Sequence, residues 1–186
     1  ALEQIQAQKP AMVWLESPTN PLLKVIDLEA VCSVTQPLGI PVVVDNTFAT
    51  ALVQRPLDLG ATLSLTSTTK YINGHSDALG GVVCTNDPEW HQKMVFSQKA
   101  LGLQPSPFDC WLITRGIKTL PLRLKQQMAN AAALADQLAG QAKVNWVRYP
   151  HRSDHPQHQV ASRQMSAGGA IVTVSFNASQ EQTYAL

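Results

Sequence analysis

Two continuous apolar runs of strand length limit the folds open to this chain. They are residues 11–15 and 40–44, and each leads into a polar turn. A continuous apolar run, unlike an alternating one, is typical of a strand that is buried on both faces. Between the two runs, Asp27 is suited to cap a helix that ends at Gly39. A third strand is expected over residues 62–66, so this strand–helix–strand pattern predicts an α/β fold.

The later part of the chain has a looser pattern. A Pro-, His- and Ser-rich loop replaces the strand–helix repeats, which predicts a domain boundary near residues 127–133. Asp109 is expected to cap a helix whose Trp111 faces the core together with the two residues that follow it. Helices are also expected over residues 2–8, 56–60, 88–100, 108–120, 123–138 and 158–165, and strands over 82–84, 144–147 and 170–176.

Composition excludes several classes of protein. The net charge is +1 and the basic residues are scattered, which gives no reason to expect nucleic acid or an acidic membrane as a partner. No apolar stretch approaches the roughly 20 residues that span a bilayer, and no secretory pattern is present at the start. The three cysteines, Cys32, Cys84 and Cys110, form no C-x-x-C pair, so we expect neither zinc site nor disulfide but reduced, mostly buried thiols in a cytoplasmic protein.

Polar residues follow the apolar runs at the point where ligands bind in open α/β sheets. Residues 16–21 contain two prolines and follow the first run, and Asp45 follows the second. A carboxylate at the end of a Val-rich strand is costly unless it has a cationic or hydrogen-bond-donating partner. Asp45 therefore either caps its own loop or, with a pyridine ring present, keeps the ring nitrogen protonated.

Residues 66–77, Thr-Ser-Thr-Thr-Lys-Tyr-Ile-Asn-Gly-His-Ser-Asp, concentrate the chemical groups of the chain. Lys70 follows a run of hydroxyls between two apolar segments. A lysine at a sheet edge, partly removed from water, can act as an amine nucleophile and form a Schiff base with a carbonyl cofactor. The neighbouring hydroxyls can donate to phosphate oxygens. Taken alone, the same segment is also compatible with an ordinary solvated turn.

In this segment Ser67-x-Thr69-Lys70-Tyr71 and the following Gly-His-Ser-Asp resemble the cofactor-lysine signature of the Cys/Met-metabolism family of pyridoxal-phosphate (PLP) enzymes. Further blocks resemble the family in its order and spacing, so the resemblance covers nearly the whole chain. They are residues 16–21, 44–48, 54–61, 114–120, 149–150, 155–158 and 163–166. One departure is Thr66, which stands where the family often has histidine.

The resemblance implies an aminotransferase-like fold, with a mostly parallel sheet between helices and a smaller α/β domain attached. Residues 1–130 would be the second half of the large PLP-binding domain, and residues 131–186 the beginning of the small C-terminal domain. It also implies roles for site residues. Lys70 is similar to the Schiff-base lysine and general base, and Asp45 to the partner of the pyridine nitrogen. Asn20 is similar to the residue near the phenolic oxygen of the cofactor and the substrate carboxylate. Ser67 and Thr69 are similar to the phosphate donors, whereas Thr47 receives no specific role.

The resemblance further implies that the chain corresponds to the middle of a family member. The glycine-rich phosphate loop, the aromatic residue that stacks on the ring and the arginine for the substrate carboxylate are expected outside it. Arg115 and Arg123 lie in helical context and are interpreted as structural. We therefore expect the isolated chain to be inactive and its sheet to expose apolar edges.

The implied activity is trans-sulfuration by γ-replacement, in which an activated homoserine reacts with a thiol such as cysteine. The block 114–123 followed by Gln126 and Gln127 favours the cystathionine γ-synthase subgroup. The γ-lyases and the homoserine sulfhydrylases are alternatives, as are a Schiff-base enzyme without PLP and an inactive fragment that needs partner chains. The implied protein is a cytoplasmic homotetramer of cysteine and methionine metabolism that binds amino acids.

Other candidate sites are interpreted as structural. His75 and Asp77 lack a third metal ligand at useful spacing, so a hydrogen-bonded turn is expected. The loop that contains His151, Asp154, His155 and His158 is interpreted as a solvated connection, not a metal site. Cys110 has no activating base near it in sequence and is expected to be a core thiol.

Overall fold

The structure is a computed structural model and describes residues 1–184. Its helices are α1 (Leu2–Gln8), α2 (Leu28–Thr35), α3 (Thr50–Val53), α4 (Pro88–Leu101), α5 (Pro107–Ile117), α6 (Leu120–Ala139), α7 (His158–Gln164) and α8 (Gln180–Tyr184), with short helical turns η1 (Gln36–Leu38), η2 (Pro56–Leu59) and η3 (Thr68–Ile72). Its strands are β1 (Val13–Glu16), β2 (Val42–Asp45), β3 (Leu63–Ser67), β4 (Gly81–Cys84), β5 (Val144–Arg148) and β6 (Thr173–Phe176). The predicted elements are therefore all present, with ends shifted by a few residues.

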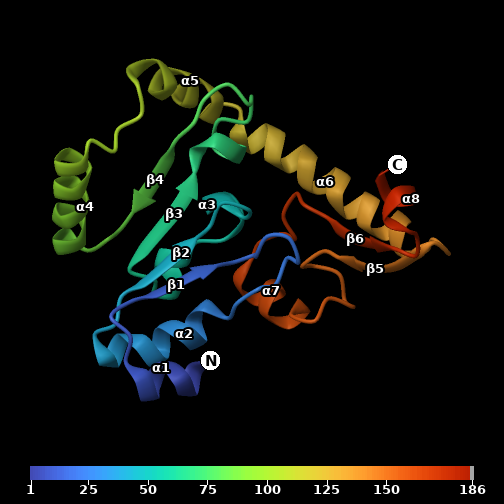
Figure 1. Cartoon of the computed structure of the whole chain (residues 1–186), viewed down its shortest axis with the longest axis horizontal. Coiled ribbons are helices and arrows are strands. Elements are labelled where there is room, and N and C mark those ends of the chain that lie inside the picture. Colours follow the sequence, from blue (N-terminus) through green and yellow to red (C-terminus); the bar gives the residue numbers. More distant parts are fainter. Residues whose placement is uncertain (185–186) are drawn as a thin grey trace.

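Two sheets organise these elements (Figure 1). The larger has the order β1-β2-β3-β4, in which β1, β2 and β3 are parallel and β4 is antiparallel to β3. The smaller is the antiparallel pair β5 and β6. This α/β arrangement with a mostly parallel large sheet is the predicted fold class.

Apolar side chains of β2 and α2 explain why the first part of the chain folds as predicted. Val42 and Val44 pack with Leu28 and Val31 in one buried cluster on the α2 side of the sheet. Complete burial of such side chains contributes about 1.5–3 kcal/mol each. The helix begins where predicted, because the Asp27 side chain accepts a hydrogen bond from the Ala30 N–H at 3.1 Å.

Helix α6 joins the two sheets (Figure 1). Leu120 and Leu124 in its first turns pack with residues of α3 and α7, whereas Ala131 and Ala135 pack with β5. The helix is unbroken from Leu120 to Ala139, so the predicted boundary near residues 127–133 lies inside it. The division into two domains stays a prediction.

Helix α5 differs from its prediction in two respects. Its N-cap is Ser106, whose hydroxyl accepts from the Asp109 N–H at 3.1 Å, so the predicted Asp109 cap is wrong. Trp111 is 59% exposed and stacks on Phe108 rather than facing the core. The predicted core thiol Cys110 is exposed as well, and so is Cys84, so only Cys32 is buried. The reason is that α4 and α5 lie beside the edge strand β4 and little of the described chain covers them (Figure 1).

The larger sheet exposes apolar side chains at both edges, as predicted. All four residues of β4 are exposed. On the opposite edge strand, β1, Trp14 is 61% exposed. Within residues 1–184, no helix combines the length and the apolar character needed to cross a membrane.

Candidate active site

The register of the sheet brings Asp45 and the lysine turn to the same edge. Asp45 ends β2, opposite Glu16 of β1 and Leu65 of β3. The next residue of the chain, Asn46, donates its N–H to Leu65 O at 2.8 Å. Since β1, β2 and β3 are parallel, their carboxyl ends carry residues 16–21, 45–47 and 67–72 to one side.

Thr47 joins Asp45 to the start of the lysine turn. Its hydroxyl donates to Asp45 Oδ1 at 2.6 Å, and its N–H donates to the same oxygen at 3.0 Å. The hydroxyl oxygen in turn accepts the Ser67 N–H at 2.9 Å. Within the described part of the chain, Asp45 Oδ2 receives no hydrogen bond and is the oxygen left for a ligand. Sequence reasoning gave Thr47 no role, although it lies two residues after a strand-end carboxylate, where hydroxyls often close such turns.

Turn η3 holds Lys70 in a backbone conformation that is not helical, with φ −88° and ψ −116°. The residue before β4 anchors the beginning of the turn, because the Thr68 N–H donates to Gly80 O at 2.9 Å. Its end closes through the Gly74 N–H, which donates to Lys70 O at 2.8 Å. The backbone of the turn is therefore fixed on both sides of the lysine.

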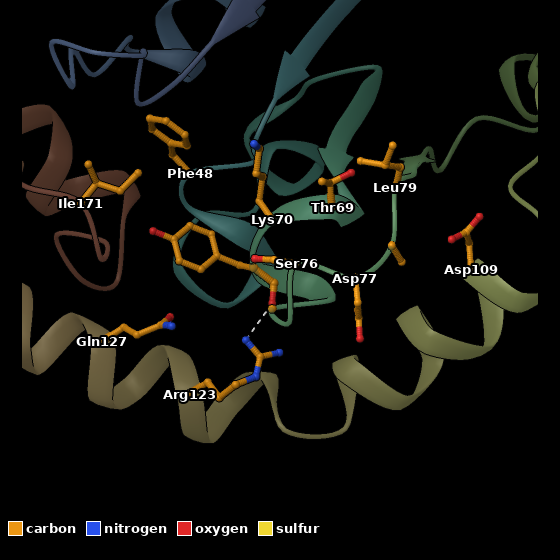
Figure 2. A pocket seen from close by; sticks show the side chains of 13 residues that line it. Phe48, Thr69, Lys70, Ser76, Asp77, Leu79, Asp109, Arg123, Gln127 and Ile171 are labelled. Atoms are coloured by element: carbon orange, nitrogen blue, oxygen red, sulfur yellow. Dashed lines mark hydrogen bonds between the residues drawn. The ribbon is translucent and has the colours of Figure 1, made fainter.

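Lys70 is exposed, and its amine forms no hydrogen bond or ion pair with the described residues. Figure 2 shows its side chain extending away from α6, toward the side of Phe48. Lys70, Phe48 and Gln127 line a cavity of about 770 Å³. Of the residues predicted to act with Lys70, Thr69 also lines this cavity, whereas Asp45, Asn20 and Ser67 lie at the same sheet edge but do not line it.

The hydroxyls before Lys70 are not equivalent. Ser67 Oγ has no hydrogen-bond partner among residues 1–184. Thr69 Oγ1 accepts from the Gly80 N–H at 3.0 Å and donates to Gly80 O at 3.3 Å. The hydroxyl of Thr68, which was not predicted to bind phosphate, is buried and unpaired among the same residues. Ser67 is thus free to donate to a phosphate oxygen, whereas Thr69 would have to exchange its long bond to Gly80.

Asn20 lies in the loop after β1 and is exposed. Its N–H donates to Glu16 Oε2 at 3.2 Å, and its side-chain amide has no partner within the described chain. The loop is anchored at Ser17, whose hydroxyl accepts the Ile26 N–H at 3.1 Å. Asn20 is therefore available to a ligand at the carboxyl end of β1, which is where residues 16–21 were predicted to lie.

A buried network of amide side chains supports this edge from behind. Gln54 Nε2 donates to Ser17 O at 2.8 Å and to Asn46 Oδ1 at 2.9 Å. Gln164 of α7 donates to Gln54 Oε1 at 2.9 Å and to Ile26 O at 2.8 Å. Buried amides with all partners satisfied hold one geometry, because any displacement leaves polar groups unpaired. Gln54 and Gln164 were missed individually, although both lie in blocks that resemble the family.

The remaining candidates differ in their contacts with the rest of the chain. Asn73 donates to Asp77 Oδ1 at 2.8 Å, and His75 Nδ1 lies 2.6 Å from Asn73 O, which confirms the hydrogen-bonded turn. No cluster of three or more His, Cys, Asp or Glu within residues 1–184 is arranged to hold a metal ion. Arg115 is exposed, whereas the Arg123 guanidinium donates to backbone carbonyls, as expected for a structural residue.

The C-terminal histidine loop is only partly the solvated connection that was predicted. His155 is 4% exposed, so the prediction is wrong for this residue. Its Nδ1 accepts the Gln157 N–H at 3.1 Å, and Nε2 lies 3.1 Å from Leu23 O. The contact with Leu23 O ties the loop to the segment after β1, whereas the bond with Gln157 lies within the loop. Arg152 and Asp154 on the outer side are paired at 3.0 Å, which also lowers the pKa of Asp154 through that hydrogen bond.

The chemistry of the free groups fits PLP. The cofactor has a basic ring nitrogen, an aldehyde and a phosphate, and the edge offers a carboxylate oxygen, an amine and a hydroxyl without other partners in the described chain. Comparison with known protein families decides between this cofactor and other carbonyl compounds. The family described as "Cys/Met metabolism PLP-dependent enzyme" matches residues 1–186.

The chain belongs to this family. It is 45% identical over 182 residues to the cystathionine gamma-lyase of Dictyostelium discoideum, covering 98% of this chain and 47% of that protein. It is also 45% identical over 175 residues to a probable cystathionine gamma-synthase of Herpetosiphon aurantiacus, covering 94% of this chain and 55% of that protein. The crystal structure of cystathionine gamma synthase from Xanthomonas oryzae pv. oryzae in complex with cystathionine has a TM-score of 0.96 at 45% identity, over 99% of this chain and 48% of that one.

These findings confirm the predicted family, its PLP dependence and its fold. The chain spans about half the length of the relatives it matches. A TM-score of 0.96 shows that the chain has the backbone fold of the corresponding part of that family enzyme.

Proposed function

We propose that this chain provides the lysine side of a PLP site in a trans-sulfuration enzyme that carries out γ-replacement on an activated homoserine with a thiol. The observation that carries the proposal is the hydrogen-bonded series from Asp45 through Thr47 to Ser67. It fixes a carboxylate with one free oxygen at the same edge as the turn that bears Lys70. The family's use of PLP supports the cofactor, and relatives named cystathionine gamma-synthase support the reaction.

Each residue at the edge has a role that follows from its free atoms. Asp45 Oδ2 would hold the proton on the ring nitrogen, Ser67 Oγ would donate to the phosphate, and Lys70 Nζ would bind the aldehyde carbon. When bound, PLP supplies an electron sink for negative charge that develops at the substrate α-carbon. The free Lys70 amine would move protons at the substrate α and β carbons as a general base. The Asn20 amide would donate to the substrate carboxylate.

A γ-lyase is the second candidate, because the relative from Dictyostelium discoideum is named cystathionine gamma-lyase and is as similar as the synthase relative. Synthase and lyase differ in the step after the γ-substituent is lost, and this edge offers the same groups to both. The reaction is tested on the PLP-loaded protein isolated from its natural source. Cystathionine formed from O-succinylhomoserine and cysteine supports the synthase, whereas cystathionine cleavage without synthesis supports the lyase.

The PLP site is tested on the 186-residue chain itself. The chain is mixed with PLP and reduced with borohydride, and the labelled peptide is identified by mass spectrometry. We expect a yellow protein with the label on Lys70, and loss of this label in Lys70→Ala. Lys125→Ala is the matched control, because Lys125 lies exposed on α6. A colourless protein, or label spread over surface lysines and unchanged in Lys70→Ala, would refute the proposal.

A further inference from the structure

Arg123 of α6 contacts the lysine turn from the side opposite to the amine of Lys70 (Figure 2). Its Nη1 donates to Tyr71 O at 3.0 Å, and its Nη2 donates to Ile72 O at 3.3 Å and to Gly116 O at 3.0 Å. Nε donates to Thr119 Oγ1 at 3.0 Å. One guanidinium therefore joins the two residues that follow Lys70 to the junction between α5 and α6.

These contacts bear directly on the direction of the Lys70 side chain. The carbonyls at the end of a helical turn have no partner inside it, and a cation placed there is favourable. By holding Tyr71 O and Ile72 O together, Arg123 fixes the Tyr71–Ile72 and Ile72–Asn73 peptide planes, which follow the peptide plane next to Lys70. Lys70 has a non-helical ψ of −116°, and the Gly74 N–H holds its carbonyl at 2.8 Å from within the turn. The next two carbonyls, Tyr71 O and Ile72 O, are held from outside the turn by Arg123.

Two glycines show that the arginine and the turn are in direct contact. A Cβ on Gly74, which has φ +72°, would lie 2.1 Å from Arg123 Nη1. A Cβ on Gly116 would lie 2.2 Å from Asn73 O, which is backbone and cannot rotate away. Atoms this close cannot coexist, so only residues without a side chain let the α5–α6 junction and the guanidinium reach the turn.

From these contacts we infer that Arg123 is a positioning residue for Lys70. It acts by holding the carbonyls that follow Lys70 in the turn, and with them the backbone from which the Lys70 side chain extends into the cavity that both residues line. The inference rests on the proposed function of Lys70. It predicts that loss of the guanidinium reduces reaction of PLP at Lys70 in protein that is still folded, which a purely structural residue would not do.

The test compares Arg123→Met with Arg115→Met. Both substitutions keep an unbranched stem and remove the guanidinium, but Arg115 is exposed in α5 and its guanidinium forms no hydrogen bond with the described turn. Each protein is loaded with PLP and reduced, and the label on Lys70 is expressed as a fraction of folded protein, measured by circular dichroism before reduction. Hydrogen bonds between a charged group and carbonyls are strong enough to change an equilibrium on the order of tenfold. We expect such a loss of Lys70 label in Arg123→Met, partial recovery on adding millimolar guanidinium, and no loss in Arg115→Met.

Failure of the proposed function and failure of this inference give different results. Unlabelled wild-type protein would remove the proposed role of Lys70. Labelled wild-type protein together with wild-type labelling of folded Arg123→Met would overturn the role of Arg123. Arg123→Lys serves if the methionine variant does not fold, because an ammonium can reach one carbonyl but not both, and its Lys70 label should be intermediate. Wild-type labelling of that variant, or failure of both variants to fold, would assign Arg123 to fold stability alone.

Discussion

Replacement of Thr47 by valine should destabilise the sheet edge at the point where Asp45 meets the lysine turn. Valine keeps the shape of threonine and removes only the hydroxyl. In the wild-type chain this hydroxyl donates to Asp45 Oδ1 at 2.6 Å and accepts the Ser67 N–H at 2.9 Å. Thr47 is buried, so water cannot fully replace the lost partner of the Ser67 N–H.

The size of the effect can be worked out from these two bonds. Loss of a hydrogen bond to a charged group costs about 1.5–3 kcal/mol, and a buried N–H left unpaired costs about 1–3 kcal/mol. Asp45 Oδ1 keeps the Thr47 N–H at 3.0 Å and is only partly buried, so the lower end of each range applies. We expect Thr47→Val to lower the free energy of unfolding by about 2–3 kcal/mol.

Urea unfolding followed by circular dichroism measures this change. The midpoint should fall with little change in the slope, since the surface exposed on unfolding is the same. Thr114→Val is the control, because Thr114 is exposed and its hydroxyl bonds only Cys110 O in its own helix, and a change within about 0.5 kcal/mol is expected there. Thr47→Ser restores the hydroxyl and should recover most of the loss. If Thr47→Val lowered stability no more than Thr114→Val, the bond series would not hold the edge.

His155 should make the protein less stable in mild acid. Burial lowers the pKa of the His155 imidazole below its ordinary value of 6.5. The folded chain therefore binds this proton less readily than the unfolded chain does. The contribution of His155 to the free energy of unfolding is complete above pH 6.5 and is lost as the pH falls below it. Urea unfolding at about pH 7.5 and about pH 5.5 should show a loss that His155→Gln largely lacks, and equal losses in both proteins would contradict this account. Burial also raises the pKa of the Cys32 thiol to about 11, so a thiol reagent at about pH 8 should modify Cys84 and Cys110 quickly and Cys32 only after unfolding. Rapid modification of all three cysteines in the folded chain would show that Cys32 is accessible.

The sequence predicted the sheet and the polar groups at its carboxyl edge because both depend on local pattern. The apolar run that ends at Val44 can be satisfied only by a strand buried on both faces, and Asp45 must then lie at its carboxyl end. The hydroxyl-rich segment before Lys70 follows the next parallel strand for the same reason. Strand order, and with it the nearness of these two segments, follows from the short right-handed connections of α/β folds.

Long-range polar contacts and the exposure of one helix could not be predicted in this way. Gln54 and Gln164 bond each other across 110 residues, and nothing in local pattern pairs two amides so far apart. Trp111 belongs to an apolar helical stretch that ordinarily faces a core, yet α5 lies at a sheet edge that little of the described chain covers. His155 lies among polar and proline residues typical of a surface loop, but tertiary contacts bury it.

The pattern of buried and exposed residues separates two requirements of the site, orientation of its groups and exclusion of water. The groups that set its geometry are buried, since Thr47, Asn46 and Gln54 are almost inaccessible. The groups that would contact cofactor or substrate, Lys70 and Asn20, are exposed. Orientation therefore comes from the described residues themselves, and it is the part of catalysis that a rigid hydrogen-bonded framework supplies. Exclusion of water does not come from them, because nothing within residues 1–184 covers the Lys70 amine. Attachment of PLP to Lys70 and catalytic turnover are thus separable, and the chain should be able to show the first without the second.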